Sequence, residues 1–403
     1  MRRTVCILLS AVALAGCNRT APTVTEPFLM EFLMPQEFKA GSYYSGQKVY
    51  MSGTASYEFE TSLRGMVSVE SVIPGIYDIT TGMEISGAQY KALLKEPVAI
   101  KDDARINIGI SLISQRIFSG QDLRFQLTAA ALSSLVISKI YYSGTKDDMG
   151  RNYTADSYVE IFNNSDEVQY LDGKYLGIAD GSANPAYFPV TENPDSIFLK
   201  QLCKFPGSGT EHPVQPGASI VIAASSARNH TLSAATSVDL SGADYEVKGM
   251  EGSGNPDVPM LPIVSNTYAS LLEFNLTTSG PNAVMLIETD ENPLDWPECF
   301  RVGKTSGDRW RRMHKKWVVD GVECLKKQAT ADPDVQTKRL QDEIDAGYVV
   351  ISSVSGYSNE SVDRKVAREA NGRYYLVDTN NSSADFAVCQ NPSPRKYDKE
   401  GLK

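Results

Sequence analysis

The sequence predicts an all-β chain made of two consecutive Ig-like β-sandwich domains, of which the second carries long loop insertions. Short segments that alternate polar and apolar residues recur along the chain, as residues 66–72 (MVSVESV) illustrate, and such alternation is typical of half-buried strands. Tyrosine is more frequent than phenylalanine, 20 against 13, and 30 glycines and 20 prolines interrupt the chain. This composition favours many short strands and turns over long helices.

The N-terminus predicts export from the bacterial cytoplasm. Arg2 and Arg3 precede an apolar stretch at residues 5–14, which is too short to span a bilayer, since a membrane helix needs about 20 residues. The stretch runs into the tetrapeptide LAGC at 14–17, which matches the bacterial lipobox. The whole pattern is therefore that of a lipoprotein precursor.

We expect residues 1–16 to be a lipoprotein signal peptide, Cys17 to become lipidated, and residues 17–25 to form a polar tether. The alternative is an ordinary signal peptide that contains a cysteine by chance. With the lipid as its anchor, the protein is expected to be held at a membrane of the cell envelope. The sequence leaves open whether it faces the periplasm or the cell surface.

The first folded domain is expected at residues 26–132. The run VIPGIY at 72–77 resembles the turn of carboxypeptidase-regulatory-like and similar Ig-like modules. This resemblance implies an Ig-like β-sandwich that serves as a scaffold. The predicted strands lie at 47–51, 55–60, 66–72, 76–79, 104–112 and 123–127.

The second domain is expected at residues 133–403, after the small-residue stretch 129–134. Strands are predicted where turn residues introduce apolar or alternating segments. Their order, with an Asp- and Asn-rich turn at 378–386 and a PSP tail at 392–394, resembles the lamin-tail domain. The resemblance implies a second Ig-like sandwich that is enlarged by insertions near 180–210, 224–280 and 290–350. The predicted strands lie at 135–142, 158–165, 170–177, 215–223 and 282–287.

The chain is more closely similar to an uncharacterised family of outer-membrane lipoproteins from Bacteroidota. These proteins pair a lipobox and a regulatory-like module with an enlarged lamin-tail-like domain. The segments SLVISKIYYSGT at 134–145 and VEIFNNSDEVQYLDGKYLG at 159–177 carry the match. The resemblance implies the fold given above and a location at the outer membrane, but it brings no established activity.

The charge balance argues against nucleic acid as a partner. Removal of Arg2 and Arg3 with the signal peptide would leave 37 of the 39 Lys and Arg residues against 49 Asp and Glu residues. A protein that coats a polyanion carries the opposite balance.

No motif for catalysis, a cofactor or a metal stands out. The three histidines, His212, His230 and His314, form no paired metal motif such as HExxH, so we expect them on the surface. The sequence also lacks a GxSxG elbow and a P-loop. The turn at 378–385 offers oxygen ligands for calcium without the ligand order of a calcium loop, so Asx-turn capping is the favoured alternative. We therefore predict no catalytic residues, no metal and no cofactor.

A basic segment at residues 301–317 is the most unusual feature of this acidic chain. Its seven cations face one acid, Asp308, and two tryptophans are interleaved among them. The segment predicts a binding site for an anion or a partner, against the alternative of a solvated loop. The residues expected to make this contact are Arg301, Arg309, Trp310, Arg311, Arg312, Lys315, Lys316 and Trp317.

Four further cysteines, Cys203, Cys299, Cys324 and Cys389, permit two disulfides in an oxidising compartment, with three connectivities. Reduced, buried cysteines are the alternative. We hypothesise a Cys299–Cys324 bond because these two flank the basic segment. It would close a loop of about 24 residues and stabilise the fold by roughly 3 kcal/mol.

These features together predict a non-catalytic outer-membrane lipoprotein that acts as a binding or accessory subunit of a cell-envelope uptake or surface complex. A TonB-dependent outer-membrane barrel is the partner that this hypothesis implies. One alternative is a surface adhesion or structural module. Another is a polymer-acting hydrolase, for which the sequence shows no nucleophile–base pair.

Overall fold

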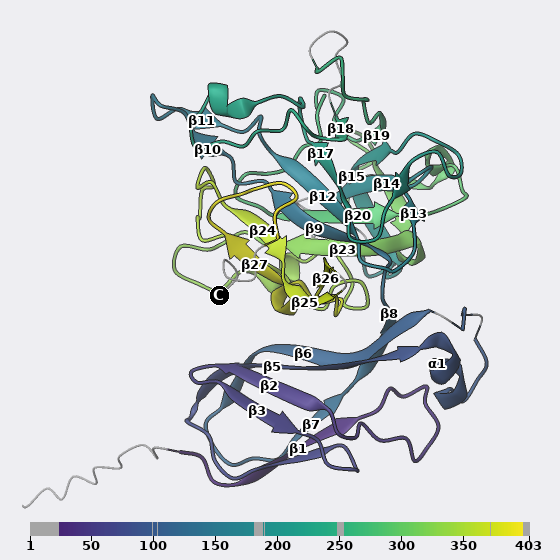
Figure 1. Cartoon of the computed structure of the whole chain (residues 1–403), viewed down its shortest axis with the longest axis vertical. Helices are drawn as coiled ribbons and strands as arrows, with labels where there is room; N and C mark the ends of the chain where they lie inside the picture. The colour runs from purple at the N-terminus through teal and green to yellow at the C-terminus, as the bar shows by residue number, and fades with distance from the viewer. Residues whose placement is uncertain are drawn as a thin grey trace, which may run out of the picture.

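The chain folds into two units, drawn one above the other in Figure 1, and nearly all their regular structure is β. The predicted all-β class is confirmed. The expected signal peptide, Cys17 and most of the tether lie outside the part of the chain that is described. A computed structural model describes residues 24–98, 100–102, 104–180, 188, 190–247, 254–370 and 372–397.

The smaller unit contains two sheets that pack across one core. One has the order β4-β1-β7, with β1 and β7 parallel, and the other has the order β3-β2-β5-β6-β8. The elements are β1 Phe28–Leu33, β2 Lys48–Gly53, β3 Tyr57–Glu60, β4 Met66–Val69, β5 Gly75–Ser86, α1 Gly87–Leu93, β6 Arg105–Ile117, β7 Leu123–Gln126 and β8 Thr128–Ala131.

Alternation of apolar residues builds this core. In β1, Met30 and Phe32 are buried while Leu29 is exposed, because successive side chains of a strand point to opposite faces. The buried side chains of β1 meet those of the other sheet, such as Val49 and Ile79, in one cluster. The predicted sandwich architecture of this region follows from that packing.

The larger unit is built on two sheets that share a second core. A six-stranded sheet has the order β18-β17-β12-β9-β24-β27, and a seven-stranded sheet has the order β21-β22-β15-β14-β20-β23, with β19 paired to β15. Their strands are β9 Leu135–Tyr141, β12 Tyr158–Asn163, β14 Tyr175–Ala179, β15 Ser196–Lys204, β17 Ser219–Ala223, β18 Tyr245–Glu246, β19 Ile263–Asn266, β20 Asn282–Ile287, β21 Glu298–Cys299, β22 Trp310–His314, β23 Val318–Cys324, β24 Ser361–Arg364 and β27 Phe386–Cys389.

In the described part of the chain, three two-stranded ribbons and several short helices accompany these sheets. The ribbons pair β10 with β11, β13 with β16, and β25 with β26. These elements are β10 Thr145–Lys146, β11 Asn152–Tyr153, β13 Gln169–Tyr170, β16 Pro213–Val214, β25 Val366–Ala370, β26 Arg373–Leu376, η1 His230–Leu232, η2 Pro293–Asp295, η3 Lys315–Trp317, η4 Val335–Thr337 and α2 Ser382–Asp385.

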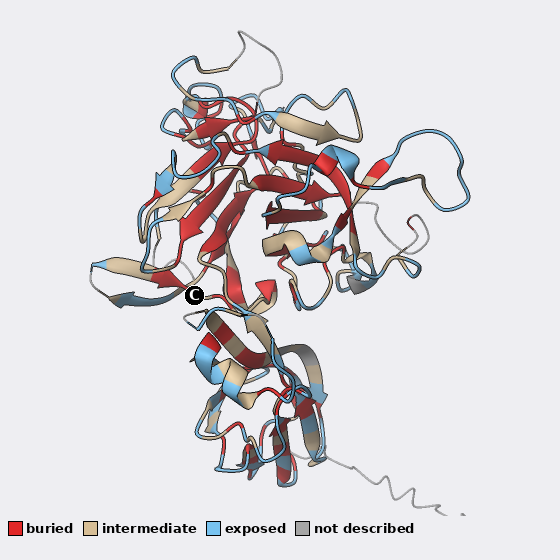
Figure 2. Ribbon diagram, turned by 90° about the vertical axis from the view of Figure 1, so that its right-hand side faces the viewer, coloured by how far each residue is buried: buried red, intermediate tan, exposed pale blue. Residues whose placement is uncertain are grey.

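The central strands of the larger unit are buried on both faces. All residues of β9, β12, β14 and β20 are buried, and they form the red centre of the unit in Figure 2. The second core covers one face of each sheet. Segments outside the sheets cover the other face, for example Leu240 on the six-stranded sheet and Leu340 on the seven-stranded sheet.

The regions expected as insertions contain strands of the sheets as well as loops. β15 lies within 180–210, β18 and β19 lie within 224–280, and β21, β22 and β23 lie within 290–350. Pairing with distant strands extends the seven-stranded sheet, and such tertiary pairing leaves little trace in a local sequence pattern.

Among the described residues, no helix has the length and apolar character needed to cross a membrane. The two units are joined by the short connection between β8 and β9, and no ladder among the described strands pairs one unit with the other.

Candidate functional site

The predicted basic segment lies along one edge of the seven-stranded sheet. β22 carries its centre and pairs antiparallel with β15 on one side and with β21 on the other. η3 follows β22 directly and leads into β23 at the opposite edge. The segment is therefore built into the sheet for part of its length.

Trp310 serves the packing of this edge. Its side chain is 1% exposed and packs against Phe188 and Phe198. The indole N–H donates to Asp180 Oδ2 at 2.8 Å, and the guanidinium of Arg301 lies 5.2 Å from the ring centroid. The structure thus places Trp310 away from any partner that approaches the surface.

Acidic residues from other segments pair with several of the predicted cations. Glu298 accepts ion pairs from Arg309 and Arg311 at 3.0 Å each. Lys315 pairs with Asp195 at 2.8 Å and also with Glu343, and its hydrogen bonds to these carboxylates raise the pKa of Lys315. Anion binding by this segment stays a prediction, and these pairs leave less free positive charge for it.

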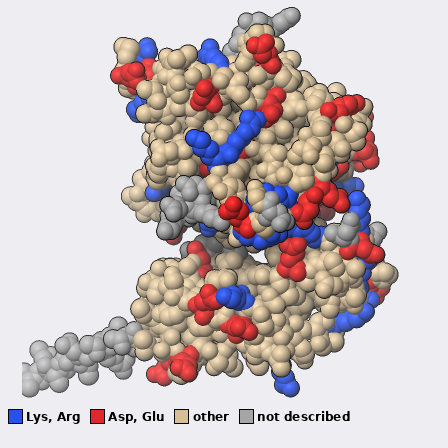
Figure 3. All heavy atoms as spheres, in the orientation of Figure 1, with Lys and Arg blue, Asp and Glu red and all other residues tan. Residues whose placement is uncertain are grey.

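Charges of both signs are mixed over the molecule. On the face drawn in Figure 3, Lys and Arg side chains lie among Asp and Glu side chains, and both gather along the junction of the two units. The residues at that junction include Glu84, Arg105, Asp166 and Arg368. The surface visible there offers no extended field of one sign that would attract a polyanion.

A cavity of about 520 Å³ opens beside the basic segment, and we call it the tryptophan pocket. Its volume is in the range of small-molecule sites, about 300–1,000 Å³. The start of β15, the residues around η2, the end of β22 and η3 form its wall. The lining residues are Ser196, Glu291, Asn292, Asp295, Trp296, Pro297, Arg312, His314 and Trp317.

Two stacked indoles form the apolar part of the tryptophan pocket. The rings of Trp296 and Trp317 are 4.8 Å apart at an interplanar angle of 9°. Trp296 is 4% exposed and belongs to the cluster that covers the outer face of the seven-stranded sheet, and Trp317 is half-buried beside it. Packing therefore holds both rings in place before any ligand arrives.

Hydrogen-bond donors and acceptors lie beside these rings. Among the described residues, Trp296 Nε1 and Arg312 Nε are buried donors without an acceptor. Leaving a buried donor unsatisfied costs about 1–3 kcal/mol. These two atoms are closed off from solvent. His314 is exposed, and its Nδ1 accepts the backbone N–H of Lys316 at 3.1 Å, so the neutral ring carries its proton on Nε2 and offers the pocket an accessible donor. Acceptors are the exposed carboxylates of Glu291 and Asp295.

η2 positions the acidic side of the tryptophan pocket. Asn292 caps this helix by accepting the backbone N–H of Leu294 at 3.2 Å, and Pro293 occupies the first helical position, where its missing N–H is not needed. The amide of Asn292 also donates to Asp295 Oδ2 at 3.2 Å. The Asn-Pro start thus fixes where Asp295 and the following Trp296 lie.

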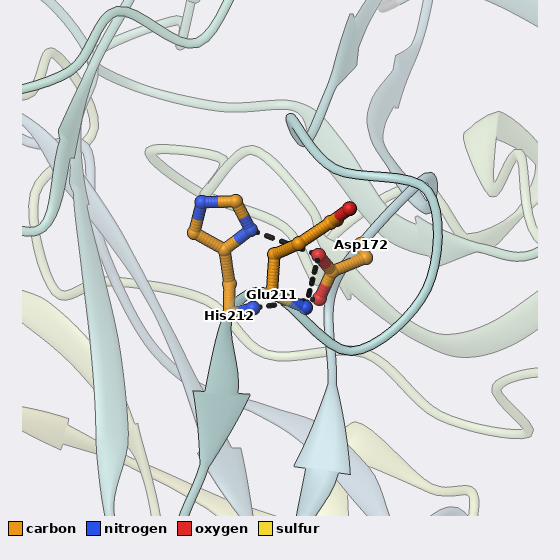
Figure 4. A group of neighbouring side chains, drawn as sticks. All are labelled: Asp172, Glu211 and His212. Carbon is orange, nitrogen blue, oxygen red and sulfur yellow. Dashed lines mark hydrogen bonds and ion pairs between the residues drawn. The ribbon is translucent and has the colours of Figure 1, made fainter.

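A second cluster joins Asp172, Glu211 and His212, whose ligand atoms lie within 4.8 Å of one another (Figure 4). Asp172 Oδ1 accepts the backbone N–H of Glu211 at 3.0 Å, and its Oδ2 accepts that of His212 at 3.1 Å. His212 Nδ1 lies 2.9 Å from Oδ1. Burial alone would raise the pKa of Asp172, but hydrogen bonds from His212 and Glu211 outweigh it and lower the pKa to about 2.

This cluster is better explained as a support for its turn than as a metal centre. A cation would have to displace the His212 ring from Asp172, whose two oxygens already accept backbone N–H groups. Gly207 closes over the group with φ +94°, and a Cβ there would lie 2.0 Å from Asp172 Oδ1. The close approach requires glycine at this position.

The hypothesised Cys299–Cys324 disulfide is wrong in this structure, where Cys203, Cys299, Cys324 and Cys389 are free thiols. Cys299 lies in β21 and Cys324 in β23, at opposite edges of the seven-stranded sheet. With neighbouring strands about 4.8 Å apart, five strand spacings separate them by roughly 24 Å, whereas a disulfide needs Cα atoms within about 7 Å. Closeness in sequence around the basic segment did not predict closeness in space.

The expectation of surface histidines is wrong for His230. This side chain is fully buried, with Nδ1 at 2.7 Å from the Tyr153 hydroxyl and Nε2 at 2.9 Å from the carbonyl oxygen of Ser226. His212 and His314 are at least partly exposed. Hydrogen bonds at both nitrogens satisfy His230 as a core residue.

In the turn at 378–385, the favoured Asx capping is present. Asn381 Oδ1 accepts the backbone N–H groups of Ser383 and Ala384 at the start of α2. Asp378 and Asp385 pair with the buried guanidinium of Arg364 at 3.2 and 3.3 Å. The arginine therefore supplies the positive charge that the calcium alternative assigned to an ion.

Sequence reasoning found one wall of the tryptophan pocket and missed the other. Arg312 and Trp317 were among the predicted contact residues, whereas Ser196 and Trp296 were not. The segment NPLDW at 292–296 could have been identified, since Asn-Pro predicts a turn and a tryptophan follows it closely. No local sequence pattern indicates that Trp296 contacts Trp317, because assembly of the sheet brings the two residues together.

The comparisons with known proteins support the fold and leave the activity open. Residues 215–393 match the model of a family described as "Protein of unknown function (DUF4876)". A crystal structure of a DUF4876 family protein from Bacteroides thetaiotaomicron VPI-5482 is similar over 94% of this chain and 98% of that chain, with a TM-score of 0.61 and 22% identity. None of the curated proteins compared with the chain matches it. The likeness fits an uncharacterised Bacteroidota family, and the Ig-like and lamin-tail-like assignments stay predictions.

Proposed function

We propose that this protein is a lipid-anchored binding protein of the bacterial outer membrane that holds a ligand in the tryptophan pocket without transforming it. The observation that carries the proposal is the combination of two packed indoles with the N–H of His314 and the carboxylates of Glu291 and Asp295 around one cavity. Preformed pockets with aromatic walls and a few placed polar groups are the usual form of small-molecule sites.

A binding role is favoured over hydrolysis by the surroundings of the two carboxylates. Glu291 and Asp295 are both exposed, whereas a carboxyl that acts as a general acid at neutral pH is held protonated by an apolar site. The described residues that line the pocket include one hydroxyl, that of Ser196, and its hydroxyl has no hydrogen bond to His314 that would activate it as a nucleophile. The hydrolase alternative therefore lacks an activated group in this pocket.

The anchor and the partner rest on the sequence. The lipobox supports acylation at Cys17 and retention at the membrane. We propose that the protein presents its ligand to a TonB-dependent outer-membrane barrel as an accessory subunit. An adhesion or structural module is the second candidate, favoured by the loops that the larger unit displays.

Fractionation of cells that express the full chain and its Cys17→Ala variant tests the anchor. We expect acylated protein in the membrane fraction, and loss of both acylation and membrane retention in the variant. Equal membrane recovery of the two proteins at the unmodified mass would contradict the proposal.

Co-purification and turnover assays test the role. We expect a TonB-dependent barrel to accompany the protein from detergent-solubilised membranes, and envelope polymers to remain intact after incubation with the mature protein. If no barrel co-purifies, the adhesion module becomes the better explanation. If fragments are released, and their release stops in Glu291→Gln, the hydrolase alternative is correct.

A further inference from the structure

We infer that the ligand of the tryptophan pocket is a neutral saccharide, bound through its hydroxyls and its apolar ring faces. The inference deepens the proposed function and rests on it, because it names the chemical class that the pocket selects. It follows from the signs of the charged groups, from the donors and acceptors, and from the indoles that line one cavity.

The charges in the wall are of both signs, so they do not form a site for a ligand of one charge. Glu291 and Asp295 are on one side, so an anion would be repelled by two carboxylates. Arg312 lines the same cavity and is always protonated, so a cation such as a quaternary ammonium group would meet a guanidinium. The cations of the basic segment do not reverse this balance, because Lys315 is paired with carboxylates.

The hydrogen-bonding groups select for hydroxyls. The exposed His314 offers an N–H on Nε2, and Arg312, whose side chain lines the cavity, has a guanidinium that carries donors only. Glu291 and Asp295 offer acceptors only. A ligand that meets both sets must donate and accept at neighbouring atoms, as adjacent sugar hydroxyls do. Bonds from a hydroxyl to a carboxylate are also among the stronger ones.

The indoles supply the apolar complement. Trp296 and Trp317 line the cavity next to these polar groups. The face of an aromatic ring is electron-rich, and the C–H bonds on the face of a pyranose ring carry a slight positive charge. A sugar ring therefore presents apolar C–H groups to the half-buried Trp317 ring, which stacks on Trp296, and hydroxyls to the polar side of the same pocket.

Intrinsic fluorescence gives a direct readout of this site. The chain has three tryptophans, and two of them line the pocket, whereas Trp310 is buried behind a hydrogen bond to Asp180. The probes are neutral malto-, cello-, xylo- and manno-hexasaccharides, with heparin and choline as the anionic and cationic comparisons. We expect at least one neutral hexasaccharide to change the fluorescence saturably, and the two ionic probes to leave it unchanged.

Substitutions in the acidic wall locate the binding. Glu291→Gln and Asp295→Asn each remove the charge from an exposed acceptor, so they preserve the fold, and we expect each to weaken saccharide binding about tenfold or more. Asp290→Asn is the matched control, because Asp290 is an exposed acid beside Glu291 that does not line the pocket. We expect the control to bind as the unchanged protein does.

The outcomes separate this inference from the proposed function. If choline or heparin binds saturably, if this binding depends on Glu291 or Arg312, and if no neutral saccharide binds, the saccharide class is wrong. The proposed role as a binding protein would then still hold. Saccharide binding that both Glu291→Gln and Asp295→Asn leave unchanged would overturn the assignment to this pocket. If no probe binds, the inference fails, and co-purification of the barrel then decides the proposed function separately.

Discussion

Replacing Arg364 by leucine should destabilise the larger unit severely. Arg364 ends β24 and is buried, and its guanidinium contacts three carboxylates. The distances are 2.9 and 3.1 Å to Asp320, 3.2 Å to Asp378 and 3.3 Å to Asp385. It also donates to the carbonyl oxygen of Ile137 at 2.9 Å, which ties it to the centre of the six-stranded sheet.

The expected loss follows from what the substitution leaves behind. Three buried acids remain without a counter-ion, and removal of one partner from a buried ion pair costs about 3–5 kcal/mol. Arg124→Leu is the matched control: its guanidinium pairs with Glu31 at 2.7 Å, and its side chain is 78% exposed. Such a surface pair contributes no more than about 1 kcal/mol.

Chemical denaturation followed by circular dichroism measures both variants. We expect the free energy of unfolding of the larger unit to fall by about 3–5 kcal/mol in Arg364→Leu and by less than about 1 kcal/mol in Arg124→Leu. Equal, small losses in the two variants would refute the conclusion that Arg364 compensates the buried acids.

Three further predictions concern the buried groups and one turn. Burial raises the pKa of Asp320 to about 7 against the opposing effect of its arginine partner, so the folded protein holds this proton more tightly than the unfolded chain. This carboxyl should therefore raise the free energy of unfolding by up to about 1.4 kcal/mol per pH unit as the pH falls from about 8 to about 5, and Asp345 and Asp385, whose pKa burial raises to about 6, act in the same direction. A steady decrease over that range in denaturant titrations contradicts this. Gly207→Ala should destabilise the protein by about 1–3 kcal/mol in thermal unfolding because of its positive φ and the nearby carboxylates. Gly209→Ala, where the new Cβ meets nothing within 4 Å, should be neutral, and equal effects would refute the steric argument. Alkylation of the folded protein should modify Cys299, whereas Cys203 is buried and should react only after unfolding. Mass spectrometry measures both reactions, and a change in mass on reduction would instead reveal a disulfide.

The sequence predicted the β architecture well where local pattern determines it. The alternation in β2 and β4 and the apolar runs of β9 and β20 are local patterns, and strands were predicted at all four places. No strand was predicted at β1. The sequence predicted β15 poorly, because this strand is defined by its pairing with β14, β19 and β22. Long-range pairing is a tertiary effect that overrides local preference.

The candidate site was predictable only in part, for the same reason. Arg312 and Trp317 were predicted as contact residues from the basic segment, and both line the tryptophan pocket. The acids that pair with its cations, such as Asp195 and Glu298, lie in other strands or turns, so the net charge of the segment overstated its free charge. Trp296 becomes a neighbour of Trp317 only when the sheet is assembled.

The most direct test of a ligand-binding tryptophan pocket is an NMR titration of the three indole N–H signals in the mature protein. On addition of a neutral hexasaccharide that binds, we predict that the signals of Trp296 and Trp317 shift saturably. The signal of Trp310 should stay in place, since its N–H already donates to Asp180. Binding that shifts only Trp310, or none of the three signals, would show that the ligand site lies elsewhere.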